Sequence, residues 1–304
     1  KEGESAPRAS LFSDSDYAFG SYAWRQCEFF YVEMIGSKRT ADAALYRLLC
    51  ELRLGITSEQ TAELMRSLLI DAARAEPNAT IISGRNAEVD AINSARLAKL
   101  NAPQSSFEGV YEALQSGVSE QKIQKWIASL NTPQSLTLKE GAKVLFTANK
   151  SGEFFNGEQG VVEKIEKSSG GEIESVVVKK PSGMLSRVGL HTYELSEIAA
   201  SGADAEQIVL ARYYQFPLKL AYAITIHKSQ GMSIPQLICD IDRIFAKGQL
   251  YVALSRATSL AGLGVIYTRA EPLLRYLQRS ASADEAVVKF YQENEFYKIS
   301  DQKI

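Results

Sequence analysis

A polar cluster ends an apolar segment in the second half of the 304-residue chain. In the stretch AYAITIHKSQGMSI (221–234), the residues His227, Lys228, Ser229, Gln230 and Gly231 follow a run that is typical of a buried strand. A turn that leads from a strand into a helix presents backbone N–H groups without an internal partner, and small residues let a phosphate approach them. The residues alone leave two interpretations open, a phosphate-binding turn and an ordinary solvated loop.

A second cluster, GQLYVALSRA (248–257), places polar side chains within an apolar helical pattern. In a helix that begins at Gln249, residues seven apart lie on one face, so the side chains of Gln249 and Arg256 could contact the same group. A guanidinium group is costly to bury without a partner. That partner is either an anion such as a γ-phosphate or a structural carboxylate, and the spacing does not decide between them.

The segments that must position these clusters alternate between strand and helix patterns. A β-branched run (79–84) precedes an amphipathic helical pattern (85–100), and further strands are expected at 222–226, 236–241 and 262–268. This alternation predicts an α/β fold. Ligands of parallel α/β sheets bind at turns that follow the carboxyl ends of strands, which is where the first cluster lies.

Residues 138–198 have a different character. Short strand patterns are separated there by turns rich in glycine and serine, which predicts a small β-barrel or sandwich inserted into the α/β domain. Lysines and arginines in this region are nearly matched by glutamates, a composition that favours an ordinary solvated surface over a strongly basic platform.

The composition limits the classes of protein that fit. A formal net charge of -2 means that a phosphate-binding surface would be a local groove rather than a general basic coat. Cys27, Cys50 and Cys239 are too scattered for a disulfide framework, and two histidines make a histidine-built metal site improbable. No apolar run approaches the roughly 18 residues of a membrane span, and the polar start lacks the apolar core of a secretory signal. We therefore expect a soluble intracellular protein.

Longer motifs in the sequence resemble those of a known family. PLKLAYAITIHKSQGMSI (217–234) followed by FAKGQLYVALSRATSLAGL (245–263) resembles motifs V and VI of the Pif/RecD-like superfamily 1 DNA helicases. Upstream, TIISGRNAEVDAINSARLAKL (80–100) is similar to the entry into the family's second RecA-like domain. LKEGAKVLFTANKSGEFFNGEQGVVEKI (138–165) is similar to the start of its inserted β-barrel of the Src-homology-3 kind. SKRTADAALYRLLCELRLG (37–55) resembles motif IV, although Lys38 and Thr40 replace the usual Phe and Gln.

The resemblance implies a role for individual residues. It implies that Arg256 is an arginine finger that stabilises charge on the transferred phosphoryl group. Gln249 and Gly231 would line the γ-phosphate side of the nucleotide, and Arg39 would add a second positive group. A further set would contact the DNA backbone or couple it to the nucleotide: Asn86, His227, Lys228, Ser229 and Gln230. The implied cofactors are ATP and Mg²⁺, both bound mainly by the family's first RecA-like domain.

The domain organisation that the resemblance implies is as follows. Residues 1–75 are the end of the first RecA-like domain with connecting helices, 76–137 and 199–304 are the two parts of the second, and 138–198 are the inserted barrel. The chain contains no GxxxxGK[ST] motif, and GSKRT (36–40) has the wrong spacing. We expect the C-terminal motor portion of an ATP-dependent DNA helicase, inactive by itself and unwinding 5′-to-3′. The alternative is a catalytically inactive helicase-like subunit of a larger assembly.

The expected partners are single-stranded or forked DNA, with RNA or a nucleoprotein assembly as further candidates and no membrane. By resemblance the protein would act in the nucleus or mitochondrion, in DNA repair, recombination and telomere maintenance. A dinucleotide-dependent enzyme also fits an α/β fold, but the sequence contains no GxGxxG motif.

Overall fold

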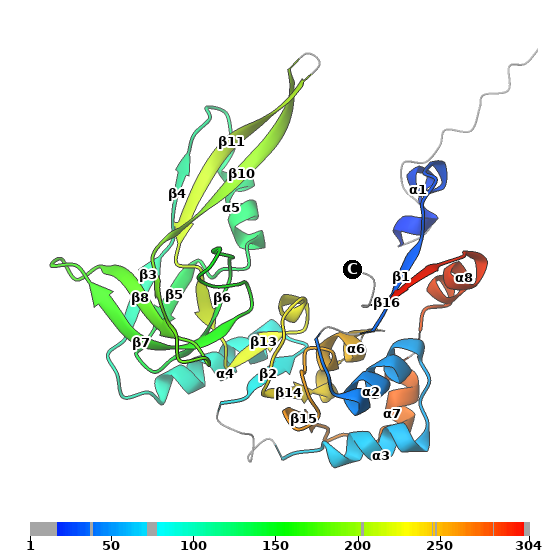
Figure 1. The fold of residues 1–304 in the computed structure, drawn as a ribbon. Coiled ribbons are helices and arrows are strands. Elements are labelled where there is room, and N and C mark those ends of the chain that lie inside the picture. Colours follow the sequence, from blue (N-terminus) through cyan, green and yellow to red (C-terminus); the bar gives the residue numbers. More distant parts are fainter. Residues whose placement is uncertain are drawn as a thin grey trace, which may run out of the picture.

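The computed structural model describes residues 17–36, 39–71, 78–201, 204–244, 246, 248–281 and 283–300. Parts of the segment predicted as the end of a first RecA-like domain, namely 1–16, 37–38 and 72–75, lie outside the described residues. The described chain forms an α/β lobe, a second β-rich lobe beside it, and two projections (Figure 1).

The α/β lobe is built on a four-stranded parallel sheet with the order β13-β2-β14-β15. Its strands are β2 (Thr80–Ser83), β13 (Ala223–Thr225), β14 (Leu237–Asp240) and β15 (Leu263–Ile266). Nearly every residue of these strands is buried, as is typical of a parallel sheet that is covered on both faces. The predicted α/β fold is confirmed at this level.

Helices on both sides of this sheet complete the lobe. α2 (Ala43–Leu54), α3 (Glu59–Ser67), α6 (Gln249–Leu254) and α7 (Leu273–Ser280) contribute to the largest hydrophobic core, which also contains β14 and β15 residues. α4 (Asn86–Ala98) packs along β13 and β2 instead, and the Asn93 amide bonds both backbone groups of Ala223. Gly55 ends α2 as its C-cap, with a φ of 72° in the left-handed region.

The second lobe contains a five-stranded antiparallel sheet with the order β12-β6-β7-β8-β9. Its strands are β6 (Lys143–Phe146), β7 (Gln159–Lys167), β8 (Ile173–Lys179), β9 (Leu185–Val188) and β12 (Leu218–Leu220). Valines of β6, β7, β8 and β9 form its core together with Phe146 and Phe216. The sheet lies where a barrel is predicted, but among the described residues the edge strands β12 and β9 do not pair with each other.

A β-ribbon projects from this lobe (Figure 1). β10 (His191–Ser201) and β11 (Asp204–Gln215) form a long hairpin, and β4 (Val110–Ala113) pairs with β11. α5 (Glu120–Ser129) packs against the ribbon, while β3 (Ser105–Glu108) pairs with β5 (Ser135–Leu138). The structure thus places 105–138 with the inserted region and puts the expected boundary between 198 and 199 inside one hairpin. The pairing of β4 with a distant strand is invisible to local sequence patterns.

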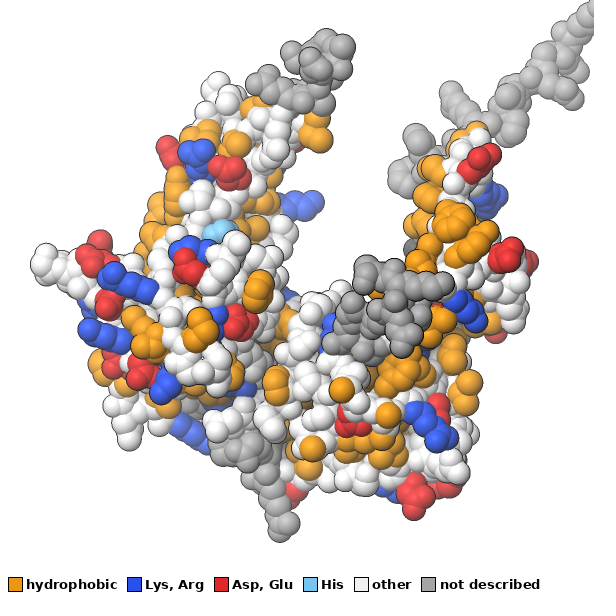
Figure 2. All heavy atoms as spheres, viewed as in Figure 1, with side chains coloured by type: hydrophobic (Ala, Val, Ile, Leu, Met, Phe, Trp, Pro, Cys, Tyr) orange, Lys and Arg blue, Asp and Glu red, His pale blue; other side chains and the backbone are white. Residues whose placement is uncertain are grey.

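The other projection is an aromatic arm, in which β1 (Val32–Ile35) pairs in parallel with β16 (Tyr297–Ser300). α1 (Tyr22–Gln26) and α8 (Glu285–Glu293) lie beside this pair. Figure 2 shows hydrophobic side chains along the arm, where Phe30 and Met34 are 69% and 71% exposed. None of the described helices has the length and apolar character needed to cross a membrane.

Candidate functional site

The first polar cluster forms a short turn after β13. A 3₁₀ helix, η3 (His227–Ser229), follows the strand, and His227, Lys228 and Gln230 are exposed to solvent. Ser229 differs, because it is fully buried and its hydroxyl donates to the carbonyl of Ile226 at 2.7 Å. Ser229 therefore cannot contact DNA with its side chain in this conformation. It is positioned to couple the turn to the interior instead.

Gly231 continues this turn with a φ of 82°, in the left-handed region. A β-carbon built at this position would meet nothing within 4 Å, so the backbone conformation and not crowding favours glycine here. The open space around this backbone leaves room for a ligand to approach.

The second cluster lies on and after α6. Gln249 and Arg256 are both buried, with exposures of 9% and 7%. The Gln249 side-chain oxygen accepts a hydrogen bond from the Ala246 backbone at 3.3 Å, which braces the turn before the helix. Arg256 follows the helix end, and its Nε donates to the carbonyl of Val252 at 3.0 Å.

The Arg256 guanidinium joins the two clusters. Its Nη1 donates to the carbonyl of Ser229 at 3.4 Å, and its Nη2 donates to the hydroxyl of Ser255 at 2.7 Å. Throughout the part of the chain that the structure describes, no carboxylate pairs with Arg256. The structural ion pair, one of the two interpretations of this arginine, therefore has no carboxylate in the described residues.

Arg39 brings a second positive charge to the same place. Its Nη1 donates to the carbonyl of Ser255 at 2.9 Å, and its Nε donates to the Ser233 hydroxyl at 3.3 Å. Burial lowers the pKa of Arg256, and the charge of the neighbouring Arg39 lowers it further. Two guanidinium groups that repel each other near Ser229 and Ser233 form a site that would be stabilised by an anion.

The segment before α2 holds Arg39 in position. The Thr40 hydroxyl donates to the carbonyl of Thr258 at 2.7 Å. One oxygen of Asp42 caps α2, and the other accepts from the Leu260 backbone N–H at 2.8 Å. The bond from Leu260 is the main reason why the pKa of Asp42 is lowered, followed by the bond from Leu45. Residues far apart in the sequence are thus tied around the two arginines.

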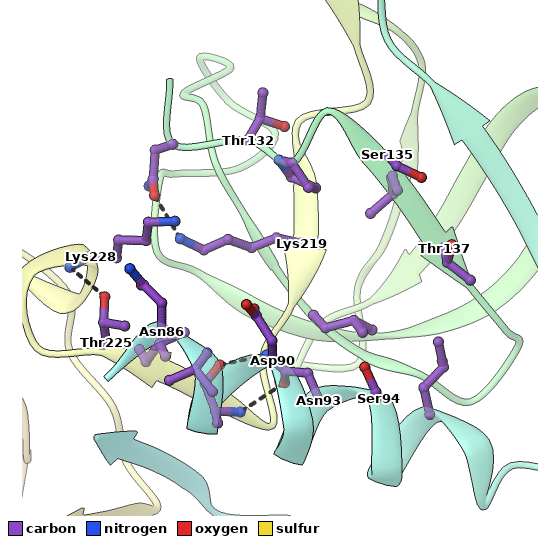
Figure 3. Close-up of a pocket in the computed structure, with 18 of the residues that line it drawn as sticks. Asn86, Asp90, Asn93, Ser94, Thr132, Ser135, Thr137, Lys219, Thr225 and Lys228 are labelled. Carbon is purple, nitrogen blue, oxygen red and sulfur yellow. Dashed lines mark hydrogen bonds between the residues drawn. The ribbon is translucent and has the colours of Figure 1, made fainter. Parts of the chain in front are cut away.

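The remaining predicted residue, Asn86, lies at the start of α4 and lines a different cavity (Figure 3). This cavity has a volume of about 520 Å³ and lies between α4, the segment 131–137 and β12. Lys228 also lines it, and so does Lys219, which the sequence analysis did not single out. Burial and the nearby Lys228 lower the pKa of Lys219 to about 8.

The structure therefore brings the predicted residues together in two groups. Arg39, Arg256 and the backbone of Ser229 form one group, and Asn86 and Lys228 form the other. The turn η3 contributes to both groups. The sequence analysis did not identify Ser255 and Ser233, although Ser255 directly precedes Arg256. It did not identify Lys219 either, because a lysine between apolar strand residues is typical of an exposed edge position.

A magnesium site does not fit the residues that the structure describes. These residues contain no group of three or more histidine, cysteine, aspartate or glutamate side chains placed to hold a metal ion. A nucleotide fits better, because neither arginine forms an ion pair with a carboxylate of the described residues and both can offer positive charge to its phosphates.

No protein-family model matches the chain. The chain is 36% identical over 300 residues to the ATP-dependent DNA helicase Pif1 of Campylobacter jejuni, covering 97% of this chain and 67% of that protein. It is 28% identical to the ATP-dependent DNA helicase Pif1 of Bdellovibrio bacteriovorus, covering 95% of this chain and 60% of that protein. The chain thus spans about two thirds or less of these relatives.

Solved structures show the same fold. A Pif1 helicase from Bacteroides superposes with a TM-score of 0.74 at 22% identity, covering 93% of this chain and 60% of that one. The Pif1 helicase from Candida albicans gives a TM-score of 0.63 at 26% identity, with 91% and 63% covered. Identity of 36% to a curated Pif1 helicase over nearly the whole chain shows that the chain belongs to the Pif1 family of DNA helicases.

Proposed function

We propose that this chain is the second motor domain of an ATP-dependent DNA helicase that moves 5′-to-3′ on single-stranded DNA and unwinds duplex. In this proposal residues 17–36 belong to the end of the first RecA-like domain. The five-stranded sheet is the inserted barrel of the Src-homology-3 kind, and the barrel insertion extends from about 105 to 220. The likeness to proteins named helicases supports the motor over the inactive subunit.

The observation that carries the proposal is the buried Arg256. Among the described residues, neutral oxygens of Val252, Ser229 and Ser255 hold its guanidinium, and Arg39 lies beside it. Placing the half-buried Arg39 beside the buried Arg256 is unfavourable unless an anion is present for part of the functional cycle. A triphosphate supplies that anion. Arg256 would then act as the arginine finger and Arg39 as a second contact to the γ-phosphate.

The nucleotide would be shared with another domain. The chain has no P-loop motif, so hydrolysis requires a P-loop domain that binds the phosphates and Mg²⁺. From this chain, Arg39 and Arg256 would hold the γ-phosphate side with Gly231 and Gln249 nearby. ATP supplies the phosphoryl group that is transferred to water. The protein groups stabilise the negative charge that develops during that transfer.

The DNA strand would lie along the exposed side of η3. His227, Lys228 and Gln230 face solvent there, and Asn86 and Lys228 line the adjoining cavity. The Bacteroides Pif1 has been solved bound to single-stranded DNA and with ADP-AlF4, and two coordinating Pif1 helicases have been described on forked duplex. Nuclear or mitochondrial location, and roles in repair, recombination and telomere maintenance, are proposals for a eukaryotic source only.

The arginine-finger assignment is tested by Arg256→Ala in the full-length helicase that carries this chain. We expect DNA-stimulated ATP hydrolysis to fall by about 10³-fold or more, the usual effect of losing such a finger. Single-stranded DNA affinity should stay within about twofold. The matched control is Arg275→Ala on α7, an exposed arginine away from the site. Unchanged hydrolysis in Arg256→Ala would contradict the assignment.

The DNA assignment is tested on the 304-residue chain itself by fluorescence anisotropy with labelled single-stranded oligonucleotides. Lys228→Ala should weaken binding and reduce its salt dependence, because one phosphate contact is lost. Lys125→Ala, on the exposed side of α5, is the control and should change neither. Equal affinities of wild type and Lys228→Ala for the oligonucleotides would contradict the proposed position of the DNA strand.

A further inference from the structure

The cavity beside α4 has a polar floor that the proposed backbone contacts do not use. Asn86, Asp90, Asn93 and Ser94 lie on one face of α4, at the i, i+4, i+7 and i+8 positions, and all four line the cavity. The opposite wall comes from the segment 131–137 (Figure 3). A volume of about 520 Å³ is in the range of pockets that hold small organic ligands.

One end of the cavity is positively charged. The side chains of Lys219, Lys228 and Asn86 point toward one another there (Figure 3). The Lys219 ammonium donates to the Asn131 side-chain oxygen at 2.6 Å. In the part of the chain that the structure describes, neither lysine forms an ion pair with a carboxylate. Two neighbouring ammonium groups without a counterion form a site suited to one phosphate.

Beyond this end, the carboxylate of Asp90 points into the cavity (Figure 3). Among the described residues no donor bonds to this carboxylate, and Asp90 is exposed. An ionised carboxylate only accepts hydrogen bonds, so the ligand group opposite Asp90 must be a donor. Val89, Leu97 and Leu136 supply apolar walls on which a flat ring can pack.

We propose that this cavity receives one nucleotide of the bound strand, with its phosphate at Lys219 and Lys228 and its base beside Asp90. The site therefore prefers a base that carries an exocyclic amine. Cytosine, adenine and guanine present such an amine on their Watson–Crick edge. The one donor of thymine on that edge, N3–H, lies between two carbonyl oxygens, which repel a carboxylate that approaches it. This inference rests on the proposed function, because it assigns the strand to the path along η3.

The preference gives the motor a weak sequence dependence. Pure backbone contact leaves affinity nearly independent of sequence, as is usual for proteins that track a single strand. If Asp90 accepts a hydrogen bond from the base that occupies the cavity, strands with different bases at that position differ in affinity. One hydrogen bond to a charged group corresponds to roughly a tenfold change in affinity.

The test measures the affinity of the 304-residue chain for labelled oligothymidylate strands in which a single cytosine is moved along the sequence. In wild type, one position should bind about tenfold more tightly with cytosine than with thymine. Asp90→Ala should bring this ratio to about one. Glu172→Ala, which removes the same charge from the exposed β7–β8 turn, should leave the ratio unchanged.

The possible outcomes separate this inference from the function on which it depends. If the wild type binds every strand with equal affinity, or if Asp90→Ala keeps the cytosine preference, the base pocket is wrong and the helicase proposal stands. If the wild type binds no strand, the proposed function itself fails. A folded state for Asp90→Ala is checked by its thermal transition. Competition by free deoxycytidine monophosphate at the strength of the strand would show that the occupant is a mononucleotide and would overturn the assignment to DNA.

Discussion

In the proposed function, Arg256 and Arg39 are side chains held in an unfavourable state that the bound nucleotide relieves. Both donate to backbone carbonyls or hydroxyls of Ser229, Ser233 and Ser255, which orient the guanidinium groups without neutralising them. A carboxylate in the same place would satisfy the charge permanently and compete with phosphate. Neutral acceptors leave the charge available, and this is the physical difference between a binding arginine and a structural one.

Lys219 provides a prediction at this scale, since its pKa of about 8 lies within the range of ordinary assays. Above pH 8 the free protein loses the Lys219 proton, so binding a phosphate must recover it. Single-stranded DNA affinity should therefore fall between pH 7 and pH 9, by at most about tenfold for each pH unit above 8.

The measurement is anisotropy at constant ionic strength over that pH range. Lys219→Arg, which stays charged, should flatten the profile. Lys125→Met, which removes an exposed lysine of α5 outside the cavity, is the control and should keep the wild-type profile. The idea is refuted if the Lys219→Arg profile is as steep as that of wild type.

At the scale of elements, the sequence predicts what depends on local patterns. The apolar run before His227 becomes β13, the pattern after Gly84 becomes α4, and Gly55 ends α2, because each of these is fixed by neighbouring residues. The N-cap of α3 is Ser58, whose side chain and backbone bond reciprocally with Thr61.

The site could be predicted only in part, for the same reason. Arg256, Arg39 and Lys228 stand out as charges in apolar or small-residue surroundings. In the sequence, Asp90 is one more polar position on an amphipathic helix. It lines a cavity because the segment 131–137 packs opposite α4, and local sequence patterns do not predict that packing. Ser229 looks exposed in the sequence and is buried, because the 3₁₀ turn rotates its side chain inward.

A glycine before β15 gives a prediction at the element scale. A β-carbon at Gly262 would lie 1.9 Å from the carbonyl oxygen of Pro235, a backbone atom that cannot move without shifting β14. Gly262→Ala should lower the free energy of unfolding by about 1–3 kcal/mol, as overpacking usually does. Gly189→Ala, where nothing lies within 4 Å, should change it by less than about 0.5 kcal/mol. Urea denaturation compares the two variants. Equal midpoints would show that the turn at Gly262 shifts to accommodate the added methyl group.

At the scale of the whole molecule, buried polar contacts join the α/β lobe to the five-stranded sheet. The Lys143 ammonium, on β6, donates to the Thr80 hydroxyl of β2 at 2.8 Å, and Gln159 of β7 donates to the same hydroxyl at 3.0 Å. The backbone N–H of Lys143 donates to the Tyr222 hydroxyl at 3.1 Å. These few contacts help to fix the relative position of the lobes, and therefore also the shape of the cavity between them.

The stability of the lobe arrangement should depend on pH through Lys143. Its pKa is about 8 in the folded protein and near 10.5, the usual value of a lysine, when unfolded. Between these values the unfolded chain binds the proton more tightly, so unfolding takes up a proton and stability rises with pH. The gain is at most about 3 kcal/mol from a shift of this size.

Thermal or urea unfolding of wild type and Lys143→Met between pH 7.5 and pH 10 tests this dependence. The wild type should gain stability relative to Lys143→Met as pH rises, because the variant never carries the buried charge. Lys289→Met on exposed α8 should track the wild type at every pH. A constant difference between wild type and Lys143→Met would mean that Lys143 stays protonated in the folded state.

The parallel pair of β1 and β16 has a consequence for how the chain folds. It joins Val32–Ile35 to Tyr297–Ser300, so the loop that it closes contains almost every other described residue. Contacts of such long sequence separation lose the most chain entropy when they form, and they form late. During synthesis β1 emerges long before its partner strand and must wait with the backbone edge that pairs with β16 unpaired. The aromatic arm is therefore where we expect the nascent chain to need a chaperone.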